Sequence, residues 1–427
     1  TPRSSPLNST LFPYPSLFRS LCSCTPGSSL ANARCLVLAG CSSDNSSSSL
    51  KIGSLLPETG SLAFLGPPEF AGVDLAVAEI NAAGGVLGAD IEHIRGDSGD
   101  TSSDIAQQTT DSHISAGVSA IVGAASSGVS FTVIDKIASA GIVHFSPANT
   151  SPDFTKYADD GYYFRTAPSD ILQGAILGNQ VVADGNENVA IIYQQSSYGE
   201  GLEAKTKEII EGAGATVVGS FPFPEAETNF DTVVDNALAA GPDSIVLISY
   251  DESKKAIPAL EKKGFDGSKI YLVDGNLADY SAETYGPYLE GAKGTLPGGQ
   301  TSDEFKQRLN DIYKANYGED LTEYAYAAES YDAVMLIALA AQQAGNDSGE
   351  AIAANMQSVS TGGTKVTDFA AGLAAIKAGE DVDYDGFSGP IEFDDNGDPT
   401  GASIGIHQYG KEGTYTLLEV VAGNSVK

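Results

Sequence analysis

The chain has 427 residues, with 23 basic and 56 acidic side chains and a net charge of −33 at pH 7. This length permits two domains of ordinary size, and the excess of negative charge disfavours nucleic acid or an anionic membrane surface as a partner. Acidity alone names no substrate, because it more often reflects a solvated surface, for example in a saline habitat, than a functional electric field.

Every cysteine of the chain lies near the amino terminus. Cys22, Cys24, Cys35 and Cys41 leave the later residues without a thiol for a disulfide, a zinc site or catalysis. The run CLVLAGC ends at Cys41 and precedes the polar tract SSDNSSSS, a pattern that resembles a bacterial lipoprotein signal. We therefore predict that Cys41 is lipidated and that residues 41–49 form a flexible tether. The alternative is a chance cysteine after a short apolar run.

Residues 1–40 are predicted to be a signal or artefact segment. They have no initiating Met and no basic n-region, and TLFPYPSLFRS at residues 10–20 resembles the translation of a sequencing adapter. We expect residues 1 to about 34 to be an assembly artefact that replaces the true start, and we exclude them from the fold.

From residue 49 onward, strand and helix patterns alternate. Short apolar runs indicate strands, and apolar residues at helical spacing, such as Phe70, Val73, Val77 and Ile80, indicate helices. Successive strand–helix units predict a doubly wound parallel sheet. The expected elements are strands at 51–56, 90–95, 120–123 and 142–145, and helices at 67–83, 103–116 and 129–140.

Two loops follow neighbouring strands of this set, at residues 126–128 and 146–152. Because parallel strands end at the same edge of a sheet, we expect these loops to lie side by side, where such sheets bind ligands. They carry hydroxyls and backbone N–H groups but no basic residue, histidine or cysteine, which suits a carboxylate or another small anion and leaves no group to activate a nucleophile. The alternative is that Ser127 only caps its helix and that Pro147 and Pro152 only shape a turn.

The pattern restarts after Arg165 and predicts a second α/β lobe. The fold class is therefore α/β, with two doubly wound Rossmann-like lobes and a chain that crosses between them more than once. We assign residues 50–168 plus 297–400 to the N-terminal lobe and residues 169–296 plus 401–427 to the C-terminal lobe. No run of 18 or more apolar residues occurs after the tether. The expected elements are helices at 170–183, 201–213, 230–240, 253–263 and 326–344, and strands at 188–193, 216–221, 244–249 and 269–273.

Six sequence blocks follow one another along residues 51–418. In chain order they are EFAGVDLAVAEINAAGGVLG, FSPANTSP, FRTAPSDILQG, SYGEG, ESYDAVMLIALAAQQAG and FSGPIEFDDNGD. Together they resemble the branched-chain amino-acid binding proteins of ABC importers, members of the type I periplasmic-binding-protein superfamily. The resemblance implies a receptor whose two lobes close over a ligand by a hinge motion and deliver it to a membrane permease.

The resemblance places part of a ligand site on the first lobe. The family's serine in the first loop falls on Ser127, and its small residue and threonine in the next loop fall on Ala148 and Thr150. In the family these groups receive the α-carboxylate of the ligand and help to hold its amine.

The second lobe is expected to complete the site. The family places a tyrosine after the strand that ends near residue 249, which is Tyr250, and an acidic residue before a glycine at the next strand end, which is Asp274. The acid would pair with the α-ammonium, in a charge-assisted bond that strengthens when closure expels water. Tyr198 and Asp170 also match cleft positions, although Asp170 could equally be the cap of the helix that it begins.

The side-chain pocket departs from the family pattern. An aromatic residue that the family often carries near the first loop is Leu65 here, with Phe64 beside it, and Tyr326 occupies another aromatic position. Leucine, isoleucine or valine suits this lining, while a different amino acid, an amide or a small carboxylate remains open.

Motifs for catalysis and metal binding lack their structural context. GASIG at 401–405 matches GxSxG, but Ser403 lies in a predicted strand and only His407 follows it, whereas the nucleophile elbow needs a strand–turn–helix and a downstream acid and histidine. DDNGD at 394–398 lacks the glutamate of a calcium loop and predicts a hairpin turn. His93, His113 and His144 have no metal-ligand spacing, so we predict no metal and no cofactor.

We therefore predict a lipid-anchored, extracytoplasmic substrate-binding protein of an ABC importer, without catalytic residues. Its expected partners are a free amino acid and the permease subunits, it meets the membrane only through its lipid anchor, and it is a monomer. Two alternatives remain open: a receptor for amides, urea or other small carboxylates, and a ligand-sensing signalling ectodomain. The end of the chain soon after its last strand favours the transport receptor.

Overall fold

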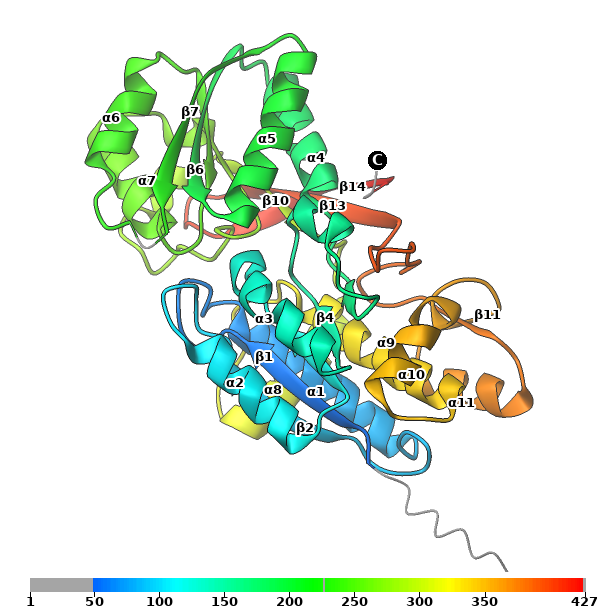
Figure 1. Cartoon of the computed structure of the whole chain (residues 1–427). Coiled ribbons are helices and arrows are strands. Elements are labelled where there is room, and N and C mark those ends of the chain that lie inside the picture. Colours follow the sequence, from blue (N-terminus) through cyan, green and yellow to red (C-terminus); the bar gives the residue numbers. More distant parts are fainter. Residues whose placement is uncertain (1–48, 226, 425–427) are drawn as a thin grey trace, which may run out of the picture. The chain divides into compact units, whose positions relative to one another are not determined.

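The computed structural model describes residues 49–225 and 227–424 (Figure 1). The predicted lipidation site Cys41, the segment 1–40 and the tether up to residue 48 lie outside these residues. None of the described helices is long and apolar enough to cross a membrane.

Five parallel strands form the first sheet, in the order β2-β1-β3-β4-β5. Strands β1 and β3 are apolar because both of their faces are buried. Ile52 and Val122 pack in the cluster that contains α1, whereas Leu55 and Ile121 pack in the cluster that contains α3. The elements are β1 (Lys51–Leu56), α1 (Gly66–Ala82), β2 (Glu92–Asp97), α2 (Ile105–Ala116), β3 (Ala120–Gly123), α3 (Ser127–Ser139), β4 (Val143–Ser146) and β5 (Tyr163–Arg165).

Seven strands form the second sheet, in the order β14-β13-β10-β9-β8-β6-β7. The strands from β6 to β10 are parallel, and β13 and β14 run antiparallel at one edge. Ile191 packs with α4 and α5, and Ile192, on the other face, packs with α6 and α7. The elements are α4 (Asp170–Ala183), β6 (Asn188–Gln195), α5 (Ser197–Gly212), β7 (Thr216–Pro224), α6 (Asp231–Ala239), β8 (Ser244–Ile248), α7 (Ser253–Lys262), β9 (Ile270–Leu272), β10 (Lys293–Pro297), β13 (Gly401–Tyr409) and β14 (Tyr415–Asn424).

Four helices that follow β10 in the chain pack back on the first sheet. The central one, α9, is buried over almost all of its length and packs along α1, and its core is continuous with β1, β3 and β4. A pair of short parallel strands, β11 and β12, completes this layer. The elements are α8 (Asp303–Tyr317), α9 (Ala327–Ala344), α10 (Gly349–Met356), β11 (Thr364–Val366), α11 (Phe369–Ala378) and β12 (Val382–Tyr384).

We call the first sheet with α1–α3 and α8–α11 the first lobe, and the second sheet with α4–α7 the second lobe. In the described part of the chain, three segments connect the lobes: residues 166–169, 298–302 and 385–400. The α/β class with two doubly wound sheets is confirmed, and the chain crosses between them more than once as predicted. The exact lobe boundaries given above stay a prediction.

Most elements lie within two residues of the predicted ranges, and the largest difference is at α5. This helix begins at Ser197, four residues before the predicted start, because the hydroxyl of Ser196 accepts a hydrogen bond from the backbone of Gly199 and so caps the first turn. Gly199 is required at its position because a Cβ atom there would lie 2.0 Å from the carbonyl oxygen of Gln194.

Candidate functional site

The two polar loops after β3 and β4 lie side by side, as predicted. The side-chain amide of Asn149 donates to the backbone oxygens of Ala124 and Ala125, at 3.0 and 2.8 Å. The N–H of Ser151 donates to the hydroxyl of Ser127 at 3.3 Å. Ser126, and not Ser127, caps α3. The hydroxyl of Ser127 therefore joins the two loops instead of closing its own helix.

Asp274 lies after β9 and is surrounded by hydrogen-bond donors. Its Oδ1 accepts from the hydroxyl of Tyr198 at 2.6 Å and from the side-chain amide of Gln173 at 3.0 Å. Its Oδ2 accepts from the hydroxyl of Tyr326 at 2.7 Å, and the backbone of Gly275 also bonds to the carboxylate. A carboxylate has about four acceptor positions, so those of Asp274 are filled. Tyr326 begins the turn into α9 of the first lobe, and its bond to Asp274 connects the two lobes.

Asp170 differs from Asp274 in its hydrogen bonding. It begins α4 and is 0% exposed, yet neither carboxylate oxygen accepts a hydrogen bond of normal geometry. Burial raises the pKa of Asp170 well above its usual value, the charge of Asp274 adds to this, and the hydroxyl of Thr150 opposes it. Ser169 is the residue that caps α4. The alternative role of Asp170 as a helix cap is therefore wrong, and its carboxylate is left without a partner of its own.

The apolar walls of the site come from both lobes. One buried cluster contains five of the residues that the sequence singled out: Leu65, Ala148, Tyr198, Tyr250 and Tyr326. The rings of Tyr198 and Tyr250 stack with centroids 5.1 Å apart. A cavity of about 150 Å³ opens between Phe64 of the first lobe and Tyr250 and Gly275 of the second. The four polar residues selected for the cleft, Ser127, Thr150, Asp170 and Asp274, are also buried, and Asp170 lies close to Thr150 and Asp274.

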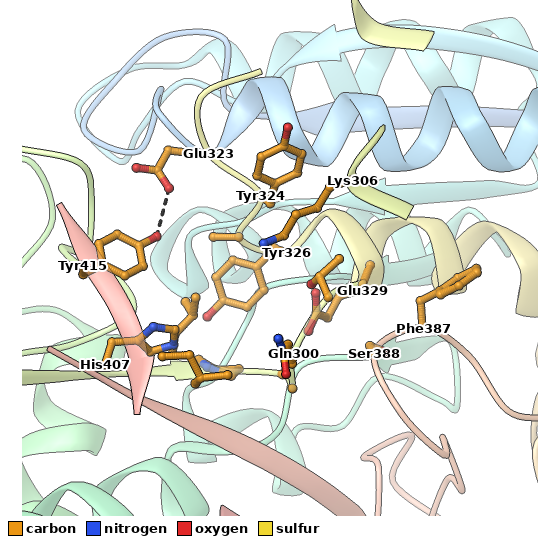
Figure 2. Close-up of a pocket in the computed structure, with 18 of the residues that line it drawn as sticks. Gln300, Lys306, Glu323, Tyr324, Tyr326, Glu329, Phe387, Ser388, His407 and Tyr415 are labelled. Carbon is orange, nitrogen blue, oxygen red and sulfur yellow. Dashed lines mark hydrogen bonds between the residues drawn. The ribbon is translucent and has the colours of Figure 1, made fainter. Parts of the chain in front are cut away.

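Tyr326 also lines a larger cavity of about 490 Å³, bordered by the 298–302 segment, α8, α9, β13 and β14 (Figure 2). Lys306 extends into this region, with its ammonium 5.5 Å from the centre of the Tyr324 ring. Burial, with the charge of Lys306, lowers the pKa of His407 to about 4, and burial raises the pKa of Glu329 to about 8. This cavity could not be predicted from the sequence, because its walls come from distant parts of the chain.

Gln173 is a site residue that the sequence reasoning missed. Its amide nitrogen bonds to Asp274 and to the hydroxyl of Thr295 at 3.1 Å, while its side-chain oxygen has no partner. A signal was available, because Gln173 stands three residues after Asp170 and therefore on the same face of α4.

The residues considered for catalysis or metal binding have other surroundings. Ser403 lies inside β13, so no nucleophile elbow forms. His93 contacts Asp74 and Ser54, and His144 is fully buried beside Tyr163. Within residues 49–225 and 227–424, no group of three or more histidine, cysteine or acidic side chains is arranged to hold a metal ion.

The relatives found by comparison with known proteins are described as binding proteins. A sequence profile described as periplasmic binding protein matches residues 49–409. The chain is 29% identical over 353 residues to the chemotactic signal transduction system substrate-binding protein BasB of Halobacterium salinarum, covering 80% of this chain and 82% of the relative. It is 24% identical over 374 residues to the leucine-, isoleucine-, valine-, threonine-, and alanine-binding protein of Pseudomonas aeruginosa, covering 87% and 92% of the two chains.

Solved structures share the fold. The branched-chain amino acid transporter substrate binding protein LivJ of Streptococcus pneumoniae, in complex with isoleucine, matches with a TM-score of 0.72 and 25% identity, over 88% of this chain and 100% of the other. A solute binding protein of R. palustris in complex with benzoate matches with a TM-score of 0.69 and 19% identity, over 89% and 98%. The second likeness concerns the fold alone.

Proposed function

Because the chain belongs to the periplasmic binding protein family, we propose that it binds a free amino acid with a branched aliphatic side chain between its two lobes. Family membership makes it an extracytoplasmic substrate-binding protein of the branched-chain amino-acid transporter type and confirms that it is not an enzyme. The identity of the ligand and the residues that hold it are the parts that we propose.

The observation that carries this proposal is the unpartnered, fully buried carboxylate of Asp170 beside the hydroxyl-bearing loops. A buried carboxylate without a partner is costly, and a cation supplied by a ligand would remove that cost. The loops at the N-terminus of α3 offer Ser127 and Thr150 to an anion at the same place. A cation and an anion on neighbouring atoms describe the zwitterion of an α-amino acid.

The filled acceptor positions of Asp274 refine the role that the sequence predicts for it. Direct pairing with the ligand's ammonium would displace a hydroxyl of Tyr198 or Tyr326, or the amide of Gln173. We therefore give the direct contact to Asp170. Asp274 contributes its negative charge and orients the two tyrosines around the cleft.

The apolar walls of the site suit a ligand with an aliphatic side chain. Leu65, Phe64 and the rings of Tyr250 and Tyr326 provide apolar surface at the site. Burying a leucine, isoleucine or valine side chain contributes about 1.5–3 kcal/mol. Such a ligand gains affinity without needing a polar partner for its side chain.

Delivery to an ABC permease, anchoring through a lipidated Cys41 and a monomeric state complete the proposal. The family and the named function of the Pseudomonas relative support transport. A second candidate is presentation of the ligand to a signalling receptor, which the name of the Halobacterium relative favours. Deletion of the gene separates them: loss of labelled leucine uptake supports transport, whereas loss of chemotaxis toward leucine with intact uptake supports signalling.

The test of the ligand is thermal unfolding of residues 49–427, refolded to remove bound ligand, with a panel of amino acids, amides, urea and small carboxylates. A ligand at 100 times its Kd should add about 2.7 kcal/mol to the stability of the native state. We expect the largest shifts with leucine, isoleucine or valine, their loss in Asp170→Asn, and their retention in Asp90→Asn, which changes an exposed acid. Stabilisation only by compounds without an amine would contradict the role of Asp170 and leave the fold unaffected.

A further inference from the structure

Arg165 is the largest fully buried side chain that the proposed function does not use. It ends β5 and is followed directly by the first segment that connects the lobes. Its side chain is 0% exposed, and its Nε donates to Oδ1 of Asp398 at 2.6 Å. A buried ion pair is by itself weak evidence for stability, because both charges lose their hydration. The burial of this ion pair therefore needs an explanation other than stability.

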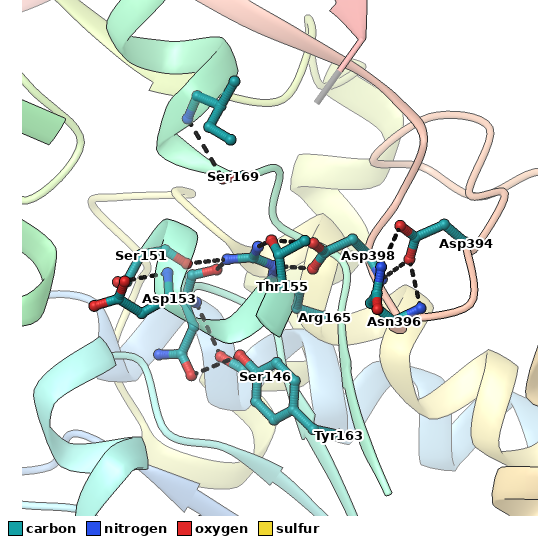
Figure 3. A network of polar contacts seen from close by, with 12 residues as sticks. Ser146, Ser151, Asp153, Thr155, Tyr163, Arg165, Ser169, Asp394, Asn396 and Asp398 are labelled. Atoms are coloured by element: carbon teal, nitrogen blue, oxygen red, sulfur yellow. Dashed lines mark hydrogen bonds and ion pairs between the residues drawn. The ribbon is translucent and has the colours of Figure 1, made fainter. Parts of the chain in front are cut away.

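The remaining donors of Arg165 hold the second polar loop (Figure 3). Its Nη1 donates to the backbone oxygens of Asn149 and Ser151, at 3.2 and 2.8 Å. These two carbonyls flank Thr150, one of the residues proposed to receive the ligand. A planar guanidinium can contact both carbonyls and the carboxylate at fixed angles, which the flexible ammonium of lysine cannot do.

The backbone of this loop is almost completely engaged. The N–H of Asn149 donates to Ser146, the oxygen of Thr150 accepts from the N–H of Asp170 at 2.7 Å, and the N–H of Ser151 donates to Ser127. With the two carbonyls on Arg165, the N–H of Thr150 is the one backbone group of residues 149–151 with no partner among the described residues. Buried N–H groups are rarely left unpaired, so this donor is available for a ligand.

The opposite end of the network lies on the third connecting segment. Asp398 belongs to residues 385–400, and its Oδ2 accepts from the hydroxyl of Thr155 at 2.6 Å, while that hydroxyl also accepts from Nη2 of Arg165. The N–H of Arg165 donates to the backbone oxygen of Gly397 at 3.1 Å. The side chain of Arg165 therefore joins the ligand loop to the third connecting segment, and the first connecting segment follows Arg165 directly in the chain.

We infer that Arg165 is a positioning residue for ligand binding: it holds the carbonyls on both sides of Thr150 so that the N–H and hydroxyl of Thr150 point to the ligand, and it fixes this loop to the connecting segments through Asp398. The inference rests on the proposed function for its ligand. The positions of the loop and of the connecting segments are then coupled, and a shift of either one changes the binding geometry.

The test compares Arg165→Lys with Val234→Ala, a core truncation in α6 of the second lobe that serves as a control for lost stability. Each variant, in residues 49–427, is measured for its Tm, for its Kd for L-leucine by calorimetry, and for amide hydrogen exchange of the peptide over residues 146–156 without ligand. We expect Arg165→Lys to raise the Kd at least about tenfold and to speed exchange of this peptide. Val234→Ala should lower the Tm while both quantities stay at the wild-type values.

The inference is overturned if Arg165→Lys changes only the Tm, as the control does. If Arg165→Lys does not fold, Thr155→Val takes its place, because it removes the hydroxyl between Arg165 and Asp398 and retains both charges. The two proposals fail separately. A wild type that ignores L-leucine contradicts the proposed ligand, while unchanged exchange over 146–156 in Arg165→Lys or Thr155→Val contradicts the positioning role.

Discussion

Glu329 is a buried acid in the first turn of α9, close to Glu69 in the first turn of α1. Glu329 is 4% exposed and Glu69 is 0% exposed, and neither oxygen of Glu69 has a hydrogen-bond partner. Burial raises the pKa of Glu329 to about 8 and raises that of Glu69 well above its usual value, with the charge of Glu329 as a second cause. The carboxyl of Glu329 is therefore mostly protonated in the folded protein at pH 7.

This pair predicts a stability that falls as the pH rises. Because the folded pKa of Glu329 exceeds its unfolded value, its contribution is complete below about pH 4.5 and is lost as the pH rises through about 8. Urea unfolding between pH 5 and 8 should show a loss of up to about 1.4 kcal/mol per pH unit for each such group. Glu329→Gln should flatten the slope, while Glu319→Gln, at an exposed position, should not. Equal slopes in all three proteins would contradict the assignment.

The binding role of the selected cleft residues stays a prediction, and the contacts that the structure shows among them could not be predicted from the sequence. Ser127, Thr150 and Asp274 followed from matching the family's motifs, because loops at strand ends keep their spacing. The partner of Arg165 could not be predicted, because Asp398 is 233 residues away and its own motif indicated only a turn. Whether an acid is filled, as Asp274 is, or unpartnered, as Asp170 is, depends on side chains from both lobes and is visible only in three dimensions.

At the level of elements, α1 and α9 pack closely against each other in the first lobe. Gly72 of α1 makes this possible, because a Cβ atom there would lie 2.2 Å from the backbone oxygen of Ala327 and 2.9 Å from Cβ of Ser330. We expect Gly72→Ala to separate the helices and to lower the free energy of unfolding by about 1–3 kcal/mol.

A matched control is available at the end of α5. A Cβ atom at Gly212 would meet nothing within 4 Å, so Gly212→Ala should be neutral or should stabilise the protein by up to about 1 kcal/mol. Chemical denaturation of both variants measures the difference. Destabilisation of similar size in both would mean that the close approach of α1 and α9 is not the cause.

Helical periodicity predicted α1, α4 and α9 to within one residue, because an apolar stripe that faces a core is a property of the local sequence. The start of α5 was predicted four residues too late, because the helix begins where the hydroxyl of Ser196 caps its first turn. The placement of α8–α11 against the first sheet depends on contacts across the whole chain.

For the whole molecule, the dominant electrostatic feature is the net charge of −33. Ion pairs on the described surface, such as Lys136 with Asp111 and Lys314 with Asp320, engage few of the acids. Repulsion among the remaining acids destabilises the compact state. The Tm should therefore rise as sodium chloride increases from about 10 mM to about 1 M, where the screening length falls to about 3 Å. A neutral solute at equal osmolality is the control, and a Tm that falls with salt would mean that attractive pairs dominate.

The helices α8–α11 come late in the chain, and their position affects the order in which the two lobes can be completed during synthesis. The strands from β6 to β10 and the helices α4–α7 form one uninterrupted stretch of sequence, so this part can fold as soon as it has been synthesised. The first sheet is made earlier, yet α9 covers its inner face only after residue 344 has emerged. Until then, the apolar residues of β1, β3 and β4 that pack on α9 remain exposed to solvent. Each lobe is therefore completed only after most of the other has been synthesised, because α8–α11 cover the first sheet and β13 and β14 then complete the second.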